Sequence, residues 1–173
     1  MFALSVDAPR FLKRWKSDVL YPFGHGLSYT TFTYANIRVS PASAPPFRDG
    51  NNSADACDTL RVSVDVSNSG GRDGDEVVQL YLQLPDATVP TTRVRLVGFD
   101  RVFLRAGSTR TVTLLVSPRA VAVVHGGSDI YADMRHVEAG RRLLFAGGGQ
   151  PDYVSALSAE VRIGNTKALA ACM

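Results

Sequence analysis

The 173-residue chain has no long apolar run, little cysteine and no dominant charge. Without a run of roughly 20 apolar residues, the sequence predicts no membrane-spanning helix. Two cysteines are too few for the framework of a disulfide-dense miniprotein. The net charge is only +3, from 19 basic and 16 acidic residues, and the basic residues are not gathered as in a nucleic-acid binder. We therefore expect no membrane and no nucleic-acid partner.

Patterns for metal and phosphate binding are also missing. His25, His125 and His136 lie in different segments, each without a cysteine or second histidine nearby, so we expect no metal site. The glycines at 147–149 lack the Lys-Ser or Lys-Thr of a phosphate-binding loop and predict a turn instead. The sequence therefore assigns no metal-binding or cofactor-binding residue, and it predicts no cofactor.

The candidate catalytic residues of the sequence also lack the surroundings that catalysis needs. Asp73, Asp75 and Glu76 could supply paired carboxylates for acid–base chemistry. Their glycine-rich turn favours solvated carboxylates, because nothing in the turn would desolvate one of them. Ser28 does not fit a nucleophile elbow, since Thr30 stands where that motif has glycine. We expect no catalytic residue in this chain.

The two cysteines are predicted to stay unbridged. Cys57 lies in residues 41–58, a stretch of loop-forming residues that we expect to be an exposed loop. Cys172 lies at the C-terminal end, in an expected tail. Neither place supplies the fixed geometry that a disulfide requires. Asn51 opens a glycosylation sequon, which has meaning only in a secreted chain.

The N-terminus leaves the compartment open. Residues 1–7 are too short and carry charge too early to be a signal peptide. The protein is either intracellular or the tail of a longer secreted chain, and the localisation stays unknown at this point.

Strands are predicted wherever apolar residues recur two apart, which is the period of a half-buried strand. The clearest such segments are residues 60–66, 78–84, 112–116 and 157–163. A phase switch between Tyr34 and Ile37 predicts a bulge in the first strand. About seven short strands separated by turns predict an all-β fold, a two-sheet antiparallel sandwich.

A distinctive segment precedes the strands. Residues 20–32, which we call the connector, pack aromatics, Pro22 and two glycines into a short irregular span. The connector closely resembles the linker that joins the α/β-sandwich domain to the fibronectin type III-like domain in glycoside hydrolase family 3. That family includes β-glucosidases and β-xylosidases.

The resemblance covers about residues 20–164. It continues, in the family's order, through residues 62–70, 74–82, 96–114, 137–140 and 145–151. The sequence of Gly147–Pro151 resembles that of the β-xylosidase-like members of the family. At residues 138–140 the chain has Glu-Ala-Gly, where the family more commonly has Glu-Pro-Gly. The resemblance implies an immunoglobulin- or fibronectin type III-like sandwich at residues 31–165. Residues 1–30 would then be a remnant of the α/β-sandwich domain plus connector, and residues 166–173 a tail.

In that family the two catalytic carboxyl groups of a retaining glycosidase belong to upstream domains, so none is carried over here. The resemblance implies a C-terminal accessory domain of an enzyme that breaks β-glycosidic bonds in carbohydrate, for example xylan. Its partners would be the upstream catalytic domains, which bind the oligo- or polysaccharide, and this chain alone would be inactive. Tyr21, Phe23 and Tyr29 would pack against the preceding domain or the sandwich edge in the complete, secreted enzyme.

A second function class remains open, namely a stand-alone β-sandwich module that binds polysaccharide or protein. Such a module needs an exposed aromatic platform on which a sugar ring can stack. Tyr81, paired with Tyr131 or Tyr153, is the candidate platform. Ordinary tyrosines on a sheet face are the competing interpretation.

Overall fold

The computed structural model describes residues 21–42, 53–125 and 135–172. Two short helical turns, α2 (Pro118–Val121) and η2 (Leu169–Cys172), accompany the strands. The strands are β1 (Phe32–Pro41), β2 (Ser53–Ala54), β3 (Leu60–Asn68), β4 (Gly74–Gln83), β5 (Arg95–Leu104), β6 (Thr109–Val116), β7 (Val123–Val124), β8 (Arg135–Val137), β9 (Gly140–Gly147), β10 (Leu157–Ile163) and β11 (Lys167–Ala168).

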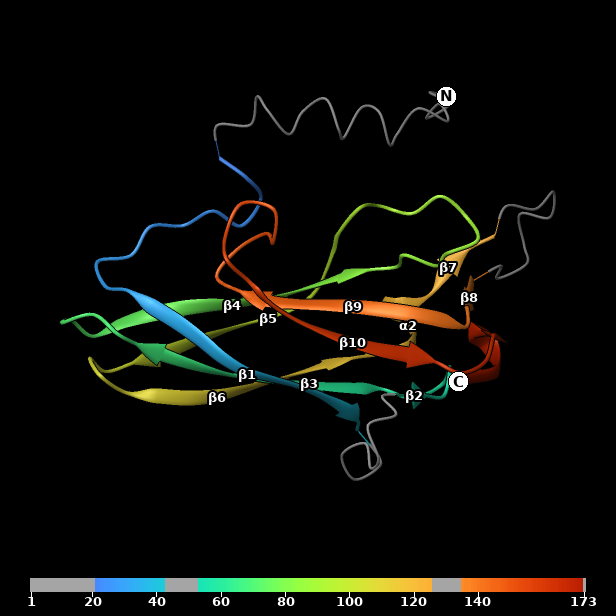
Figure 1. Cartoon of the computed structure of the whole chain (residues 1–173), viewed down its shortest axis with the longest axis horizontal. Coiled ribbons are helices and arrows are strands. Elements are labelled where there is room, and N and C mark those ends of the chain that lie inside the picture. The colour runs from blue at the N-terminus through green and yellow to red at the C-terminus, as the bar shows by residue number, and fades with distance from the viewer. Residues whose placement is uncertain (1–20, 43–52, 126–134, 173) are drawn as a thin grey trace.

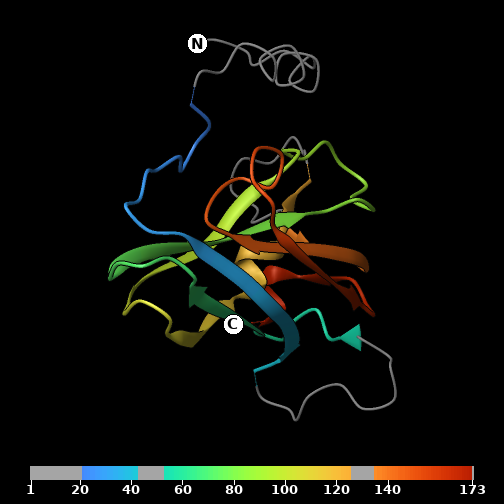
Figure 2. The same cartoon turned by 60° about the vertical axis from the view of Figure 1, so that its left-hand side comes forward.

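Two sheets face each other, as Figures 1 and 2 show, and their long strands pair antiparallel. One has the order β1-β3-β6, and the other has the order β2-β10-β9-β4-β5. The predicted two-sheet sandwich is confirmed, and its seven long strands are β1, β3, β4, β5, β6, β9 and β10. A small third sheet, β11-β8-β7, lies at one end. The connector crosses the outer side of the five-stranded sheet, above β4 in Figure 1.

The core follows the predicted alternation. Val62, Val64 and Val66 of β3 are buried, and they join Leu80 and Leu82 of β4 in one apolar cluster. Because side chains alternate across a strand, the residues between them lie on the outer faces. On β4 this leaves Asp75, Val77, Gln79, Tyr81 and Gln83 on the side that the connector crosses.

The predicted bulge in the first strand is also confirmed. The register of β1 against β3 shifts between Ala35 and Arg38. Asn36 takes a positive φ of 53° there, a region that asparagine tolerates better than most residues. Its side chain donates a 2.9 Å hydrogen bond to Asp65 of β3, which supports the distorted backbone.

The expected exposed loop at residues 41–58 is wrong where the structure describes it. Ala54 and Ala56 are buried in the core cluster. They are buried because β2 pairs in parallel with the end of β10. Local composition does not predict this pairing, since the two strands are far apart in the sequence. Asn51 of the sequon lies outside the described residues.

The prediction of two unbridged cysteines is wrong. Cys57 and Cys172 form a disulfide, with a Cα–Cα distance of 4.9 Å. The reason is that the C-terminal residues are docked on the domain. β11 pairs with β8, and Leu169 in η2 is buried in the core. Tertiary packing thereby brings the two cysteines to the fixed distance that a disulfide requires.

Candidate functional site

The connector is held on the sheet by one buried side chain of β4. Gln79 is only 5% exposed, although it points to the outer face. Its amide nitrogen donates to the carbonyl oxygen of Gly24 at 3.0 Å and to that of Gly148 at 3.4 Å. Its amide oxygen accepts a 2.8 Å hydrogen bond from the Tyr81 hydroxyl. Gln79 therefore joins the connector to the β9–β10 turn.

Gly24 is required at this contact. Its φ of +74° is a conformation that side-chain-bearing residues rarely adopt. A Cβ atom there would also overlap the Gln79 amide. On either side, His25 N donates to Pro22 O at 3.1 Å, and the Tyr21 and His25 rings lie 4.9 Å apart. The connector thus reaches Gln79 as a tight turn.

A second anchor lies where the connector enters β1. The Thr30 hydroxyl donates a 2.7 Å hydrogen bond to Asn68 Oδ1, at the end of β3. Asn68 is buried, and its amide nitrogen donates to the carbonyls of Arg72 and Leu104 at 2.7 and 3.1 Å. A Cβ on Gly70 would lie 2.8 Å from the Thr31 nitrogen. Asn68 and Gly70 therefore shape the turn that receives the connector.

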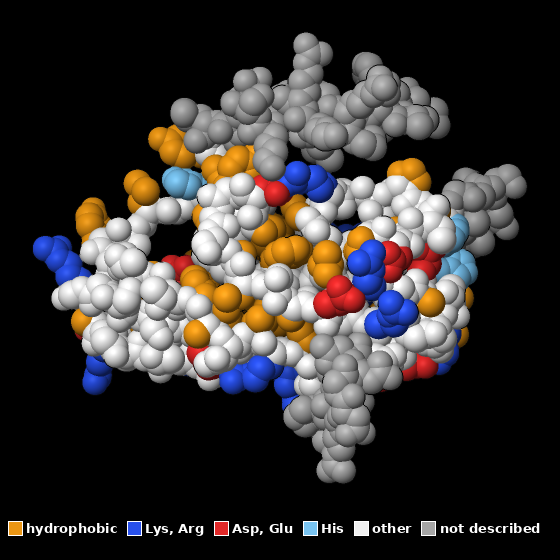
Figure 3. All heavy atoms as spheres, viewed as in Figure 1, with side chains coloured by type: hydrophobic (Ala, Val, Ile, Leu, Met, Phe, Trp, Pro, Cys, Tyr) orange, Lys and Arg blue, Asp and Glu red, His pale blue; other side chains and the backbone are white. Residues whose placement is uncertain are grey.

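Around these anchors, apolar side chains of the connector remain uncovered. Tyr21, Phe23, Leu27 and Tyr29 are exposed, Tyr29 at 94%, and apolar groups protrude along the connector in Figure 3. Val77, Phe99 and Phe103 on the same side of β4 and β5 are exposed as well, with Phe99 at 66%. The register places Phe99 beside Gln79 and Phe103 beside Asp75. We call these seven residues the apolar strip.

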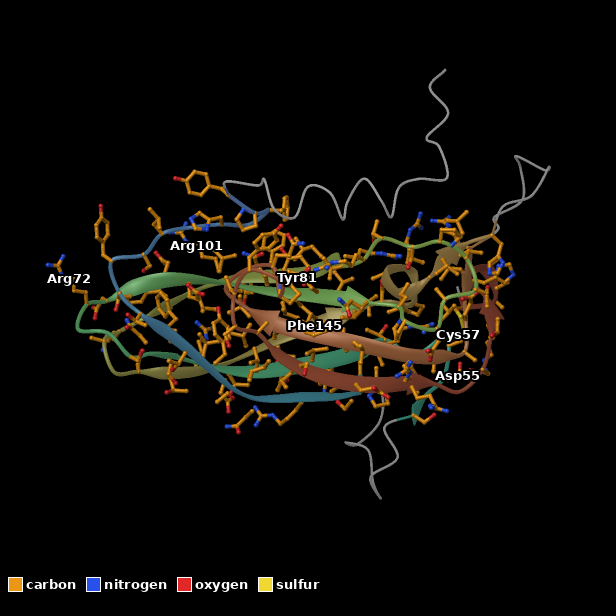
Figure 4. All side chains as sticks on the ribbon, turned by 45° about the horizontal axis from the view of Figure 1, so that its top comes forward. Asp55, Cys57, Arg72, Tyr81, Arg101 and Phe145 are labelled. Atoms are coloured by element: carbon orange, nitrogen blue, oxygen red, sulfur yellow. A yellow bond between two sulfur atoms is a disulfide. The ribbon has the colours of Figure 1, made fainter. Side chains whose placement is uncertain are left out.

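One ion pair interrupts the apolar strip. Arg101 of β5 lies 2.9 Å from Asp75 of β4, and both side chains are largely exposed. Figure 4 shows Arg101 on the side of the sheet that carries the connector. Large exposed apolar surfaces are rare on monomers and mark interaction surfaces. The strip is the strongest candidate interface among the described residues.

Tyr81 does not form a stacking platform. It is only 3% exposed, and burial raises the pKa of its hydroxyl. Phe145 of β9 is its cross-strand neighbour, as Figure 4 also shows. Tyr153 is 37% exposed, and Tyr131 lies outside the described residues. A sugar platform built on Tyr81 is therefore excluded by its burial.

The three carboxylates that the sequence placed in a turn differ in their surroundings, and two of them, Asp75 and Glu76, lie in β4. Asp73 accepts a hydrogen bond from the Ala106 amide at 2.8 Å, and Asp75 pairs with Arg101. Glu76 differs from the prediction, because it is desolvated between the sheets. It accepts a 2.5 Å hydrogen bond from the Tyr34 hydroxyl. Burial raises the pKa of Glu76 more than the hydrogen bonds from Tyr34 and the Val77 amide lower it.

A buried network of charged side chains lies around Glu138, between β8 and β9. The sequence did not predict it. Glu138 accepts hydrogen bonds from the amide and hydroxyl of Thr88, and His125 Nε2 lies 2.8 Å from its carboxylate. Burial alone would raise the pKa of Glu138, but these partners hold it below its ordinary value. Arg142 is fully buried and donates to the Glu138 carbonyl at 2.5 Å. The network fastens the β4–β5 loop to β9.

Metal and membrane signals are absent from the part of the chain that the structure describes. No three His, Cys, Asp or Glu side chains in residues 21–42, 53–125 and 135–172 are grouped to hold a metal ion. No helix in those residues is long and apolar enough to cross a membrane.

Comparison with known proteins agrees with this architecture. A family model described as a fibronectin type III-like domain matches residues 76–149, from β4 to the end of β9. The chain carries a fibronectin type III-like domain. Thermostable beta-glucosidase B of Acetivibrio thermocellus is 37% identical over 149 residues, which are 86% of this chain. Probable beta-glucosidase D of Aspergillus niger is 35% identical over 152 residues, or 84% of this chain.

Solved structures give the same relationship. A β-glucosidase from Streptomyces venezuelae, DesR, matches 89% of the chain with 35% identity and a TM-score of 0.69. The match covers 17% of that enzyme. β-Glucosidase 3B of Thermotoga neapolitana matches 92% of the chain with 28% identity and a TM-score of 0.68, and the match covers 19% of that enzyme.

The chain spans 18% of the length of the two curated relatives. The matched portion is their C-terminal part, and these relatives are family 3 β-glucosidases. The fibronectin type III-like domain of this chain is therefore of the kind that ends family 3 glycoside hydrolases. Its motif residues Gly74–Leu82 include Gln79 and Tyr81, so the most distinctive sequence match coincides with the connector anchor.

Proposed function

We propose that this domain serves as the C-terminal accessory domain of a family 3 β-glycosidase and packs against the upstream catalytic domains through the apolar strip. The observation that carries the proposal is the connector, which is anchored at Gln79 and Asn68 yet exposes its aromatic side chains. Two anchors set the direction in which the chain leaves the sandwich. The exposed rings then offer the preceding domain a surface to bury.

The energetic argument rests on the aromatic side chains of the strip. Each such ring can bury on the order of 150–250 Å² in an interface, at roughly 25 cal/mol per Å² of apolar area. The Arg101–Asp75 pair beside them adds a polar contact that restricts the orientation of the partner. In this proposal residues 1–30 belong to the junction with the preceding domain.

Catalysis is assigned to the upstream domains, so this chain alone should not hydrolyse β-glycosides. The curated relatives quoted above are named β-glucosidases. A β-glucoside is therefore the first substrate class to propose for the complete enzyme. The Gly147–Pro151 motif supports a β-xyloside, as in xylan breakdown, as the second. Turnover of a chromogenic β-glucoside or β-xyloside by the purified chain, retained after repurification, would contradict this assignment.

The interface can be tested in the isolated chain, where the proposed partner is absent. We expect the chain to bind a hydrophobic dye and to self-associate through the strip. The double variant F99S/F103S, and a chain that starts at Thr33, should both lose most of this signal. The control is Leu115→Ser, because Leu115 is 60% exposed but lies on β6 of the other sheet. Equal dye binding and elution for all four proteins would reject the strip as an interface.

A further inference from the structure

The C-terminal segment, residues 164–172, is docked on the turn after β2 by contacts that do not involve sulfur. Gly164 N donates to Ala54 O at 2.9 Å, which extends the parallel pairing of β2 with β10. Ala56 N donates to Asn165 Oδ1 at 3.0 Å. Leu169 is buried in the core. These contacts join residues more than 100 positions apart.

One carboxylate strengthens this docking. Asp55 accepts hydrogen bonds from Lys167 Nζ at 2.9 and 3.1 Å and from Asn165 Nδ2 at 3.0 Å. It also accepts the amide of Cys57, which orders the turn that carries the first cysteine. Figure 4 shows Asp55 and Cys57 together at this end of the sandwich. The result is a Cα–Cα distance of 4.9 Å between Cys57 and Cys172, within the range of protein disulfides.

We infer that the Cys57–Cys172 disulfide is a maturation bond that locks the C-terminal segment onto the folded domain, and that the chain acquires it in an oxidising compartment. This inference is independent of the proposed accessory function. Disulfides persist in secreted, periplasmic or endoplasmic-reticulum environments and are rare where thiols are kept reduced. It also decides between the two compartments that the sequence left open.

The chemistry is thiol–disulfide exchange with a dithiol–disulfide oxidant. One protein thiolate attacks the oxidant's disulfide, and the second thiolate then attacks the resulting mixed disulfide. One S–S bond forms between Cys57 and Cys172, and the one in the oxidant is lost. The two cysteines together give up two electrons and two protons, and the oxidant leaves as a dithiol.

A lock has an effect here because the docked segment lies at a chain end and contains little secondary structure of its own. β11 has two residues and η2 has four, and chain ends fray more readily than the elements they pack on. The bond links residues 115 positions apart, so it also restricts the unfolded chain strongly. We expect reduction to lower the Tm by roughly 5–15 °C and to increase hydrogen exchange in residues 164–172.

The first test compares the chain exported to a bacterial periplasm with the chain made in a reducing cytoplasm. Peptide mapping without reductant should find the crosslink in the exported protein, and thiol titration should find two free thiols in the cytoplasmic one. The folded cytoplasmic chain should form the crosslink with oxidised glutathione much faster than the same chain in urea. Free thiols in the exported protein would overturn the inference.

The second test separates the lock from the docking. C57S/C172S should melt at the temperature of the reduced wild type and should not respond to reductant. L169A, which weakens the docking alone, should melt lower than the wild type but still lose Tm on reduction. Hydrogen exchange at residues 164–172 provides a second readout if L169A is too unstable to purify. An oxidised wild type whose Tm and exchange do not change on reduction would reject the lock.

Discussion

The side-chain amide of Gln79, in the middle of β4, donates a 3.0 Å hydrogen bond to the carbonyl oxygen of Gly24 in the connector, 55 positions earlier. The contact places a buried polar side chain on the outer face of a sheet, where apolar burial does not explain it. It links the domain to the segment from which a preceding domain would arrive.

Gln79→Ala should release the connector. The variant loses the bond to Gly24 and leaves the Tyr81 hydroxyl without its acceptor. We expect the free energy of unfolding to fall by about 1–3 kcal/mol and hydrogen exchange to rise in residues 21–31. Urea unfolding and exchange mass spectrometry measure both effects. Gln83→Ala, on the same face of β4, is the matched control, and an equal loss in both variants would contradict a specific anchor.

Asn68→Ala should be more damaging than its position in a turn suggests. The side chain is buried and takes part in four hydrogen bonds, with Thr30, Gly70, Arg72 and Leu104. Removing it leaves several of these groups unpaired, and we expect a loss of about 2–4 kcal/mol. Thermal unfolding provides the measurement.

Ser67→Ala is the comparison for this variant. Ser67 is the preceding residue and shares an exposed hydrogen bond with Thr109. Its loss should cost below about 1 kcal/mol. Similar losses at the two positions would show that Asn68 is not the centre of the turn.

Glu76 should make the domain less stable as the pH rises. Burial raises the pKa of Glu76 in the folded chain, so the folded state holds this proton more tightly than the unfolded state does. Its stabilising contribution is complete below the unfolded pKa of about 4.3 and is lost as the pH rises through the folded pKa. Glu76→Gln should remove this dependence and be more stable than the wild type at pH 7. Urea unfolding between pH 4 and pH 8 tests the sign.

Tyr34→Phe is the complementary variant. It removes the hydroxyl that donates to Glu76, and it should destabilise the wild type more than the Glu76→Gln background at pH 7. Identical effects in the two backgrounds would mean that the two side chains do not couple.

Asp86 should have the opposite pH dependence. Hydrogen bonds from the side chain and amide of Arg141 lower its pKa to about 2. Its contribution is therefore present above the unfolded pKa of about 3.9 and is lost as the pH falls towards 2. Asp86→Asn should flatten the stability profile in this acid window.

Arg141→Gln should flatten the same window, because it removes the other partner of the pair. The double variant D86N/R141Q should then add little to either single one. Additive acid sensitivity, measured by urea unfolding from pH 2 to pH 5, would show that the pair does not set this part of the profile.

The sequence alone was sufficient to predict the two-sheet sandwich and the family to which the domain is similar. Residues such as Val62, Val64 and Val66 alternate with polar ones because one face of a strand meets the core and the other meets water. The two-residue period therefore predicts which residues of a strand are buried. The phase switch after Tyr34 likewise predicted the bulge, since an extra residue must invert the alternation.

The connector motif indicated the family, but the sequence did not show which residues the connector contacts. Its glycines and aromatics are local features, but the partners of Gly24 and Thr30 are Gln79 and Asn68, which come from other strands. Glu76 shows the same limit. Its sequence neighbours are those of a solvated turn, whereas in the folded chain its carboxyl group is desolvated and bonded to Tyr34 of the other sheet.

Tertiary structure decided the position of the C-terminal segment and the pairing of the two cysteines. A cysteine in a loop and a cysteine near a terminus have no predictable distance, because chain position says nothing about docking. Leu169 and the Asp55–Lys167 pair bring that terminus to the turn after β2, and the disulfide follows. Alternation and turn residues report local geometry, whereas contacts between distant segments depend on the whole packed fold.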